Sequence, residues 1–115
     1  MEAITTADQL LMRYDSVLHA SERMLGAARE ENWDTVIELQ TQYSALADTL
    51  RPVDAIVPLD DSQRARKYDV TRRILSNETA VRELAAPRLA RLSALLESGR
   101  QTRALHKMYG LSAHG

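Results

Sequence analysis

Apolar residues recur at alternating spacings of three and four along most of this 115-residue chain, which is the period of an amphipathic α-helix. The first run comprises Leu11, Tyr14, Leu18, Ser21, Leu25 and Ala28, and the second comprises Val36, Leu39, Tyr43, Leu46 and Leu50. With only four glycines and three prolines, the composition gives few places for turns. The sequence therefore predicts an all-α fold.

The two runs predict a pair of long helices joined by a short connection. Thr6 can N-cap the first helix, with Gln9 reaching back in a capping box, and this helix is expected to run to about Arg29. Asn32 can cap the second helix. Because so short a connection leaves long helices antiparallel, we expect an αα-hairpin over about residues 7–50.

Pro52 and Pro58 bracket the one long loop, because proline lacks the amide proton that a helix needs. Asp60, with Gln63, can cap the next helix, which continues to about Ser76. Asn77 could then cap a further helix or lie as a buried polar residue in a continuous one, and its local propensity favours the cap.

A long leucine-rich segment follows, with a proline near its beginning. Its apolar positions are Val81, Leu84, Ala85, Leu89, Leu92 and Leu96. Pro87 predicts either a kink or a helix start, and Gly99 interrupts the pattern. We expect a core drawn from Leu11, Leu18, Leu25, Val36, Leu39, Leu46, Leu84, Leu89 and Leu92.

A separate amphipathic helix is expected after Gly99. Arg100, Arg103 and Lys107 share one of its faces, and Leu105, Met108 and Tyr109 lie on another. A helix this short holds only when it docks on something. The sequence thus predicts an antiparallel bundle of three to four helices in residues 1–99, followed by a tail helix in residues 100–115 of the same domain.

Charge and cysteine content narrow the class of protein. The net charge of −1 combines −5 in residues 1–51 (nine acids, four arginines) with +4 in residues 52–115 (seven acids, eleven bases). This asymmetry favours packing of the halves against each other or against charged protein partners. With no cysteine, no basic start followed by an apolar core, and no apolar run of about 20 residues, we expect a cytoplasmic protein without membrane insertion.

Catalytic and metal motifs are lacking in the sequence. His19 with Asp15 and Glu22 is the only histidine at helical spacing from carboxylates, a pattern that charged helix surfaces produce by chance. There is no nucleophile-elbow motif and no glycine-rich phosphate loop. We expect no enzymatic activity, no cofactor and no metal.

Basic residues in the second half could be considered for nucleic-acid binding. They are Arg64, Arg66, Lys67, Arg72, Arg73, Arg82, Arg88 and Arg91. Asp69, Glu78 and Glu83 interrupt them, and aromatic residues are not interleaved for base stacking. A solvated face explains them better than direct contact with nucleic acid.

The ordered features together resemble the FliT family of flagellar type III export chaperones. These features are the hairpin joined at ENWDTVIELQTQY, the Pro-flanked loop, RRILSNETAVRELAAPRLARLSALL, and a terminal helix ending KMYG. The resemblance implies a protein that binds the filament-cap protein before export and delivers it to the export ATPase complex and the export gate. Where the flagellar master transcriptional regulator is present, the resemblance also implies restraint of that regulator.

The resemblance further implies roles for particular residues. It gives Tyr109 contact with the export gate, and it gives the tail, with Arg103, Leu105, Lys107 and Met108, a regulatory role in masking the partner surface. Val70, Ile74, Val81 and Arg88 fall in the region of partner contacts, although core positions for the first three and a solvated position for Arg88 explain each of them better.

Two other functions remain alternatives at this point: a chaperone for the hook–filament junction proteins, and a small DNA-associated helical regulator. A monomer or a weak homodimer is expected.

Overall fold

The structure, a computed structural model, describes residues 3–108, with the side chains of Thr102 and residues 104–108 left out of the description. Its helices are α1 (Ala7–Arg29), α2 (Trp33–Asp48) and α3 (Asp61–Met108), with no strand among the residues described. The all-α prediction is confirmed. The chain divides into two compact units, residues 1–82 and 83–115.

Helix α1 begins with the predicted capping box. The backbone N–H of Gln9 donates to Thr6 Oγ1 (3.2 Å), and the backbone N–H of Thr6 donates to the side-chain Oε1 of Gln9 (3.1 Å). Two backbone N–H groups that have no partner within the helix are thereby satisfied.

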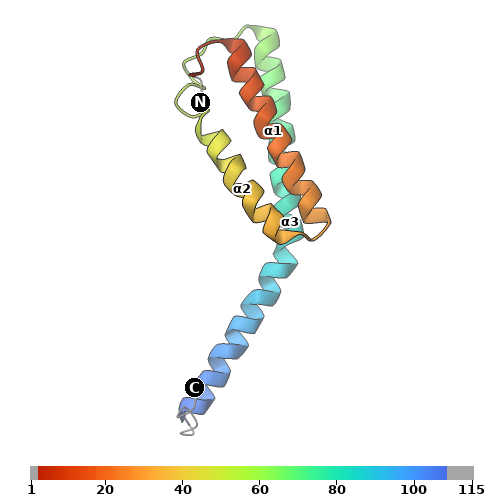
Figure 1. Cartoon of the computed structure of the whole chain (residues 1–115), viewed down its shortest axis with the longest axis vertical. Coiled ribbons are helices and arrows are strands. Elements are labelled where there is room, and N and C mark those ends of the chain that lie inside the picture. The colour runs from red at the N-terminus through yellow and green to blue at the C-terminus, as the bar shows by residue number, and fades with distance from the viewer. Residues whose placement is uncertain (1–2, 109–115) are drawn as a thin grey trace. The chain divides into compact units, whose positions relative to one another are not determined.

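The connection between α1 and α2 is a Schellman turn closed on a residue other than glycine. The Asn32 amide donates to Ala27 O (2.9 Å) and the Glu31 amide donates to Ala28 O (3.0 Å), which is the hydrogen-bond pattern of this motif. Glu31 has a φ of 59°, in the left-handed region that favours glycine. Asn32 also N-caps α2, because its side chain accepts from the Thr35 amide (3.4 Å). The turn therefore needs only three residues, and α1 and α2 form the expected hairpin (Figure 1).

The proline-bracketed loop is folded onto the first unit. Leu50 and Val57 are buried in its core. At the end of the loop, Asp60 Oδ1 accepts from the Gln63 amide (2.8 Å) and the Ser62 hydroxyl (3.0 Å), and these bonds lower the pKa of Asp60. The predicted cap at Asp60 is thus confirmed and begins α3.

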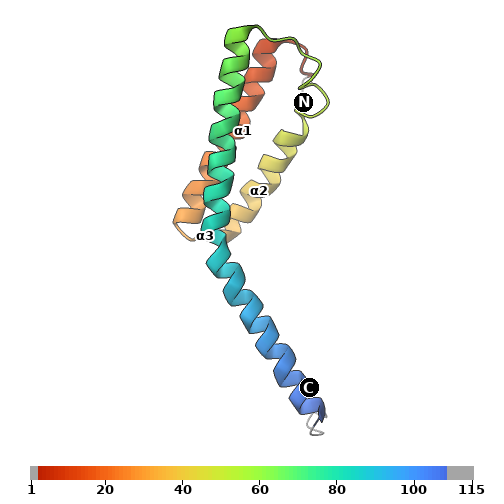
Figure 2. The same cartoon turned by 180° about the vertical axis from the view of Figure 1, so that it is seen from behind.

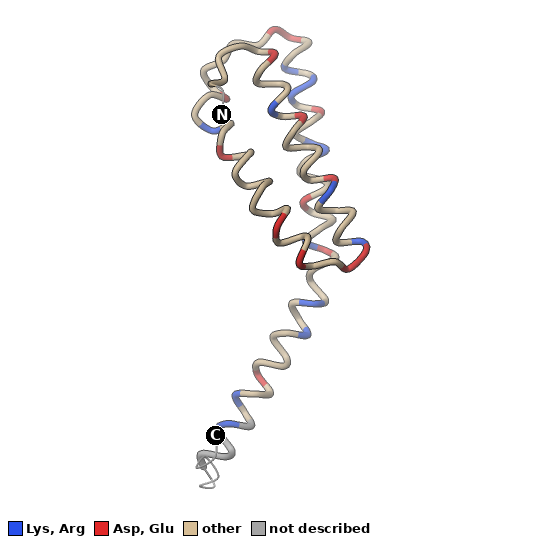
Figure 3. Tube along the Cα trace, viewed as in Figure 1, with Lys and Arg blue, Asp and Glu red and all other residues tan. Residues whose placement is uncertain are grey.

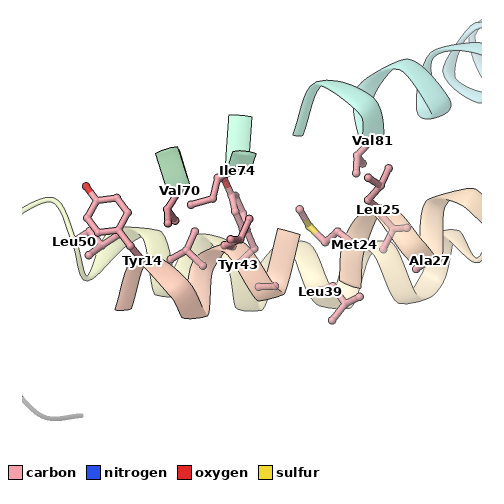
Figure 4. Packing of buried hydrophobic residues seen from close by; sticks show 14 of the residues in the cluster. Tyr14, Met24, Leu25, Ala27, Leu39, Tyr43, Leu50, Val70, Ile74 and Val81 are labelled. Carbon is pink, nitrogen blue, oxygen red and sulfur yellow. The ribbon is translucent and has the colours of Figure 1, made fainter. Parts of the chain in front are cut away.

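The core of the first unit draws on α1, α2 and the first part of α3. In both views α1 and this part of α3 run side by side, and α2 diverges from them toward the loop (Figures 1 and 2). The core members from the hairpin include the predicted Leu18, Leu25, Val36 and Leu39, with Leu46 partly buried against them. Leu11 is also buried, as predicted. Helix α3 contributes Val70, Ile74 and Val81, whose side chains are directed toward the hairpin (Figure 4).

Helix α3 is continuous where the sequence predicted breaks. The favoured cap at Asn77 is wrong: residue 77 is helical, and its amide bonds to α1 instead of to its own backbone. A helix start at Pro87 is also wrong, because the surrounding alanine, leucine, arginine and glutamate favour helix strongly enough to continue through it. The interruption expected at Gly99 is absent as well. A helical glycine costs only about 1 kcal/mol, and a Cβ at Gly99 would meet nothing within 4 Å.

Three leucines expected in the core are exposed. Leu84, Leu89 and Leu92 have exposed fractions of 39%, 61% and 45%. They belong to the second unit, in which the structure describes one helical segment and no second element that could cover them.

Across residues 3–108, no helix is long and apolar enough to cross a membrane.

Candidate partner-binding surfaces

The apolar residues for which the resemblance implies partner contacts lie inside the first unit. Val70, Ile74 and Val81 are all less than a tenth exposed and pack against residues of α1 and α2. They occupy positions separated by four and seven residues, so they lie on one face of α3. A partner could reach them only if the bundle opened.

Polar contacts fix this face of α3 against the hairpin. Asn77 Nδ2 donates to Ser21 Oγ (3.0 Å), and the fully buried Ser21 hydroxyl donates to Leu18 O (2.7 Å). At the next residue of α3, Glu78 Oε1 accepts a hydrogen bond from the Tyr43 hydroxyl of α2. The pKa of Tyr43 is raised well above its usual value, chiefly by burial and to a lesser degree by this hydrogen bond to a carboxylate. Sequence reasoning raised Asn77 as a buried polar residue but could not identify Ser21 as its partner.

A second polar cluster fixes the loop. The Tyr14 hydroxyl donates to Asp54 Oδ1, and Lys67 Nζ lies 2.9 Å from the same oxygen and 5.8 Å from the centre of the Tyr14 ring. Partial burial opposes ionisation of Asp54, but the bonds from Tyr14 and Lys67 outweigh it and lower the pKa of Asp54. Burial and Asp54 together raise the pKa of Tyr14.

Many of the basic residues considered for nucleic-acid binding contact acids of their own chain. Ion pairs join Arg64 to Asp61, Arg72 to Asp69, Arg66 to Asp15, and Lys67 to Asp54. Figure 3 shows acidic and basic positions alternating along this part of the chain. Their arrangement is that of a mixed-charge surface rather than of a basic face that would follow a phosphate backbone.

The histidine pattern noted in the sequence does not converge on one point. His19 and Asp15 line an open hollow of about 480 Å³ on the seam of α1 and α2, whereas Glu22 lines a different hollow beside α3. Asp15 is ion-paired with Arg66. Within the part of the chain that the structure describes, no three His, Asp or Glu side chains are grouped to hold a metal ion.

The most prominent apolar surface is on the second unit. Five large residues there are between 39% and 68% exposed: Leu84, Leu89, Leu92, Leu95 and Leu96, which we call the leucine stripe. Leu92 is three residues from Leu89 and Leu95, four from Leu96 and eight from Leu84, so the five lie along one broad side of α3. The sequence pattern identified this apolar side but led to the wrong conclusion that it was buried.

The remaining residues singled out in the sequence lie within or near the second unit. Arg88 is exposed on α3, four residues from both Leu84 and Leu92. Arg103 is exposed, and its Nε donates to Gly99 O (3.4 Å). Leu105, Lys107 and Met108 lie within α3, but their side chains, like all of Tyr109, lie outside the description. Within the second unit, the structure thus brings together Arg88 and the leucine stripe.

Comparison with known proteins identifies the family. The family described as flagellar protein FliT matches residues 11–111. Flagellar protein FliT of Yersinia enterocolitica is 31% identical over 105 residues, covering 88% of this chain and 84% of the relative, and that of Photorhabdus laumondii is 28% identical over 101 residues, covering 88% and 81%. The crystal structure of flagellar protein FliT from Bordetella bronchiseptica matches with a TM-score of 0.69 and 43% identity, covering 75% of this chain and 97% of that one. This all-helical chain, with its capped hairpin and long third helix, therefore belongs to the FliT family of flagellar proteins, a family of chaperones and not of enzymes.

Proposed function

We propose that this protein is a cytoplasmic flagellar export chaperone that binds the filament-cap protein before export, prevents its premature assembly, and delivers it to the export ATPase complex and the export gate. Where the flagellar master transcriptional regulator is present, the chaperone also restrains it. The observation that carries the proposal is the family match over residues 11–111.

The apolar surface of α3 supports a protein as the ligand. An exposed leucine gains about 1.5–3 kcal/mol when it is fully buried, so five on one side favour docking of an apolar helical segment. We place partner contacts on α3, where Arg88 is exposed. Val70, Ile74 and Val81 would take part only after a rearrangement of the first unit, because they are buried.

Calorimetric titration of the full chain with the filament-cap protein and with its C-terminal peptide tests this function. We expect binding with a negative heat-capacity change, the signature of apolar burial. A junction protein of the hook and filament serves as the matched ligand, since preference for it would favour the alternative chaperone role. A folded chain that binds neither the cap protein nor its peptide would contradict the proposal.

We also propose that residues 100–115 form a regulatory tail whose Tyr109 contacts the export gate. If the tail masks the client surface part of the time, the apparent client affinity falls by the fraction masked. A chain ending at Gly99 should therefore bind client more tightly and lose gate binding. Tyr109→Ala should weaken gate binding alone, and Tyr68→Ala, at an exposed tyrosine of the first unit, is the control. Equal client affinity of the full and shortened chains would exclude the masking role.

A further inference from the structure

The charges around the leucine stripe are not evenly distributed about the helix. From residue 83 to residue 103, α3 carries four arginines and two glutamates: Arg88, Arg91, Arg100, Arg103, Glu83 and Glu97. Figure 3 shows these positions along the helix. The arginines and the glutamates lie on different sides of this helix.

The arginines lie within the leucine stripe or along its edges. Arg88 is four residues from Leu84 and from Leu92, and Arg103 is seven residues after Leu96, so both share the side of the leucines. Arg91 lies seven residues after Leu84 and four before Leu95, along one edge. Arg100, four residues after Leu96, follows the other edge.

The glutamates lie on the opposite side. Glu97 is five residues after Leu92 and Glu83 is nine residues before it, spacings of about one and a half and two and a half turns. Glu97 lies 3.7 Å from Arg100, at the border between the two sides. The apolar side of the second unit is therefore bordered by positive charge, and its negative charge faces away.

We propose that the leucine stripe docks an acidic amphipathic helix of a partner protein, one that carries carboxylates beside its own apolar positions. The inference deepens the proposed function by naming the chemistry of the partner segment, and it rests on that function only for the expectation that the ligand is a protein. Leucines supply the affinity, and the bordering arginines select the sign of the partner's charge.

The same charge distribution argues against a second copy of the chain as the occupant. Two copies paired through their leucine stripes would bring the arginines along one stripe, among them Arg88, Arg91 and Arg103, close to the arginines along the other. Like charges brought together at an interface oppose association. An acidic helix would instead meet a guanidinium on each edge of the stripe.

Two synthetic helix-forming peptides of about 20 residues test the proposal. They share one leucine pattern and differ only in carrying glutamate or lysine beside the leucines. In calorimetry with the full chain, we expect the glutamate peptide to bind at least tenfold more tightly, with a difference that shrinks as salt is raised. Equal binding of the two peptides would overturn the proposal. No flagellar protein is used, so failure here leaves the separate titration with the cap protein unaffected.

Variants of the full chain assign the site. Leu92→Gln with Leu96→Gln should weaken binding of the glutamate peptide at least tenfold, whereas Leu75→Gln, at an exposed leucine of the first unit, should not. Arg91→Glu should reduce the preference for the glutamate peptide several-fold, and Arg23→Glu, which changes net charge equally, should leave it unchanged. Unchanged binding by the double leucine variant would overturn the proposal.

The other occupants give different results. A chain that sediments as a dimer, with a double leucine variant that sediments as a monomer, would assign the stripe to a second copy and overturn the proposal. If the chain is monomeric and binds neither peptide, and the double leucine substitution lowers its free energy of unfolding, the stripe is covered by the chain's own first unit. That result would also overturn the proposal.

Discussion

The two parts of α3 carry the same apolar period and have opposite environments. In residues 61–82, Val70, Ile74 and Val81 are buried, and Asn77 and Glu78 bond to α1 and α2. In residues 83–101, five leucines that also share one side of the helix are exposed. A period of three and four identifies which side of a helix is apolar. It does not determine what covers that side, since this depends on elements distant in sequence.

Two single leucine-to-alanine variants, one in each part of the molecule, test this difference in environment most directly. Leu39→Ala should lower the free energy of unfolding by about 2–5 kcal/mol, because it leaves a cavity in the first unit. Leu92→Ala should change it by no more than about 0.5 kcal/mol, as for an ordinary surface position. Urea unfolding measures both. Similar losses at the two sites would mean that the second unit is covered as well as the first.

The polar contact between α3 and α1 offers a sharper test on the packed side. Asn77→Ala should cost about 1–2 kcal/mol, because it removes the bond to the fully buried Ser21 hydroxyl. Ser76→Ala, at an exposed neighbour on the same turn, is the control and should be close to neutral. Equal effects in urea unfolding would show that the hydrogen bond adds nothing to docking of α3.

The tyrosine pair between α2 and α3 should have a smaller effect. Tyr43→Phe removes the donor to Glu78 and should cost about 0.5–1.5 kcal/mol. Tyr68→Phe removes a hydroxyl from an exposed ring of α3 and should be nearly silent in the same unfolding experiment. A silent Tyr43→Phe would indicate that solvent replaces the bond to Glu78 at no cost.

The dependence of stability on alkaline pH tests the contacts of Tyr14 and Tyr43. Tyrosines in the unfolded chain ionise near pH 10, whereas Tyr14 and Tyr43 have raised pKa values when folded. Their contribution is complete below about pH 10, and it is lost as the pH rises beyond that, because the unfolded state then binds fewer protons. The double variant Tyr14→Phe with Tyr43→Phe should show a shallower loss of stability over this range. An unchanged slope would place the effect in other groups.

The smallest change is expected at the turn of the hairpin. Glu31→Gly should raise stability by up to about 1 kcal/mol, because glycine adopts a positive φ without steric cost. Glu30→Gly, one residue earlier with a φ of −87°, should instead destabilise or be neutral. Thermal unfolding of the two variants measures the difference.

The sequence predicted most of the hairpin because its signals are local. The capping residues act on backbone groups within a few positions. Thr6 with Gln9 begins α1, Asn32 begins α2 and, after the loop, Asp60 begins α3, as expected. The left-handed Glu31 was missed, since glycine is the residue that marks such a turn. Breaks at Asn77 and Gly99 were predicted from intrinsic preference, and a bond to α1 and the neighbouring helix formers override that preference.

The candidate surface was recognised only in part. The spacing of Leu84, Leu89 and Leu92 defined an apolar side, but an isolated leucine pattern reads the same whether it belongs to a core or to a docking surface. The arginines bordering those leucines were interpreted as a solvated face. Their position beside the apolar side was the signal in the sequence that could have indicated a docking surface.

The three-residue turn between α1 and α2 has a consequence for the order of folding. Closing so short a connection costs little chain entropy, whereas α3 must wait for the loop over residues 49–60 to be ordered. Contacts between elements adjacent in the chain form fastest. The residues of the hairpin also precede all of α3 in the chain, so they are synthesised first. We therefore expect α1 and α2 to pair in the folding transition state, with substitutions in the hairpin slowing refolding and those at the contacts of α3 mainly accelerating unfolding.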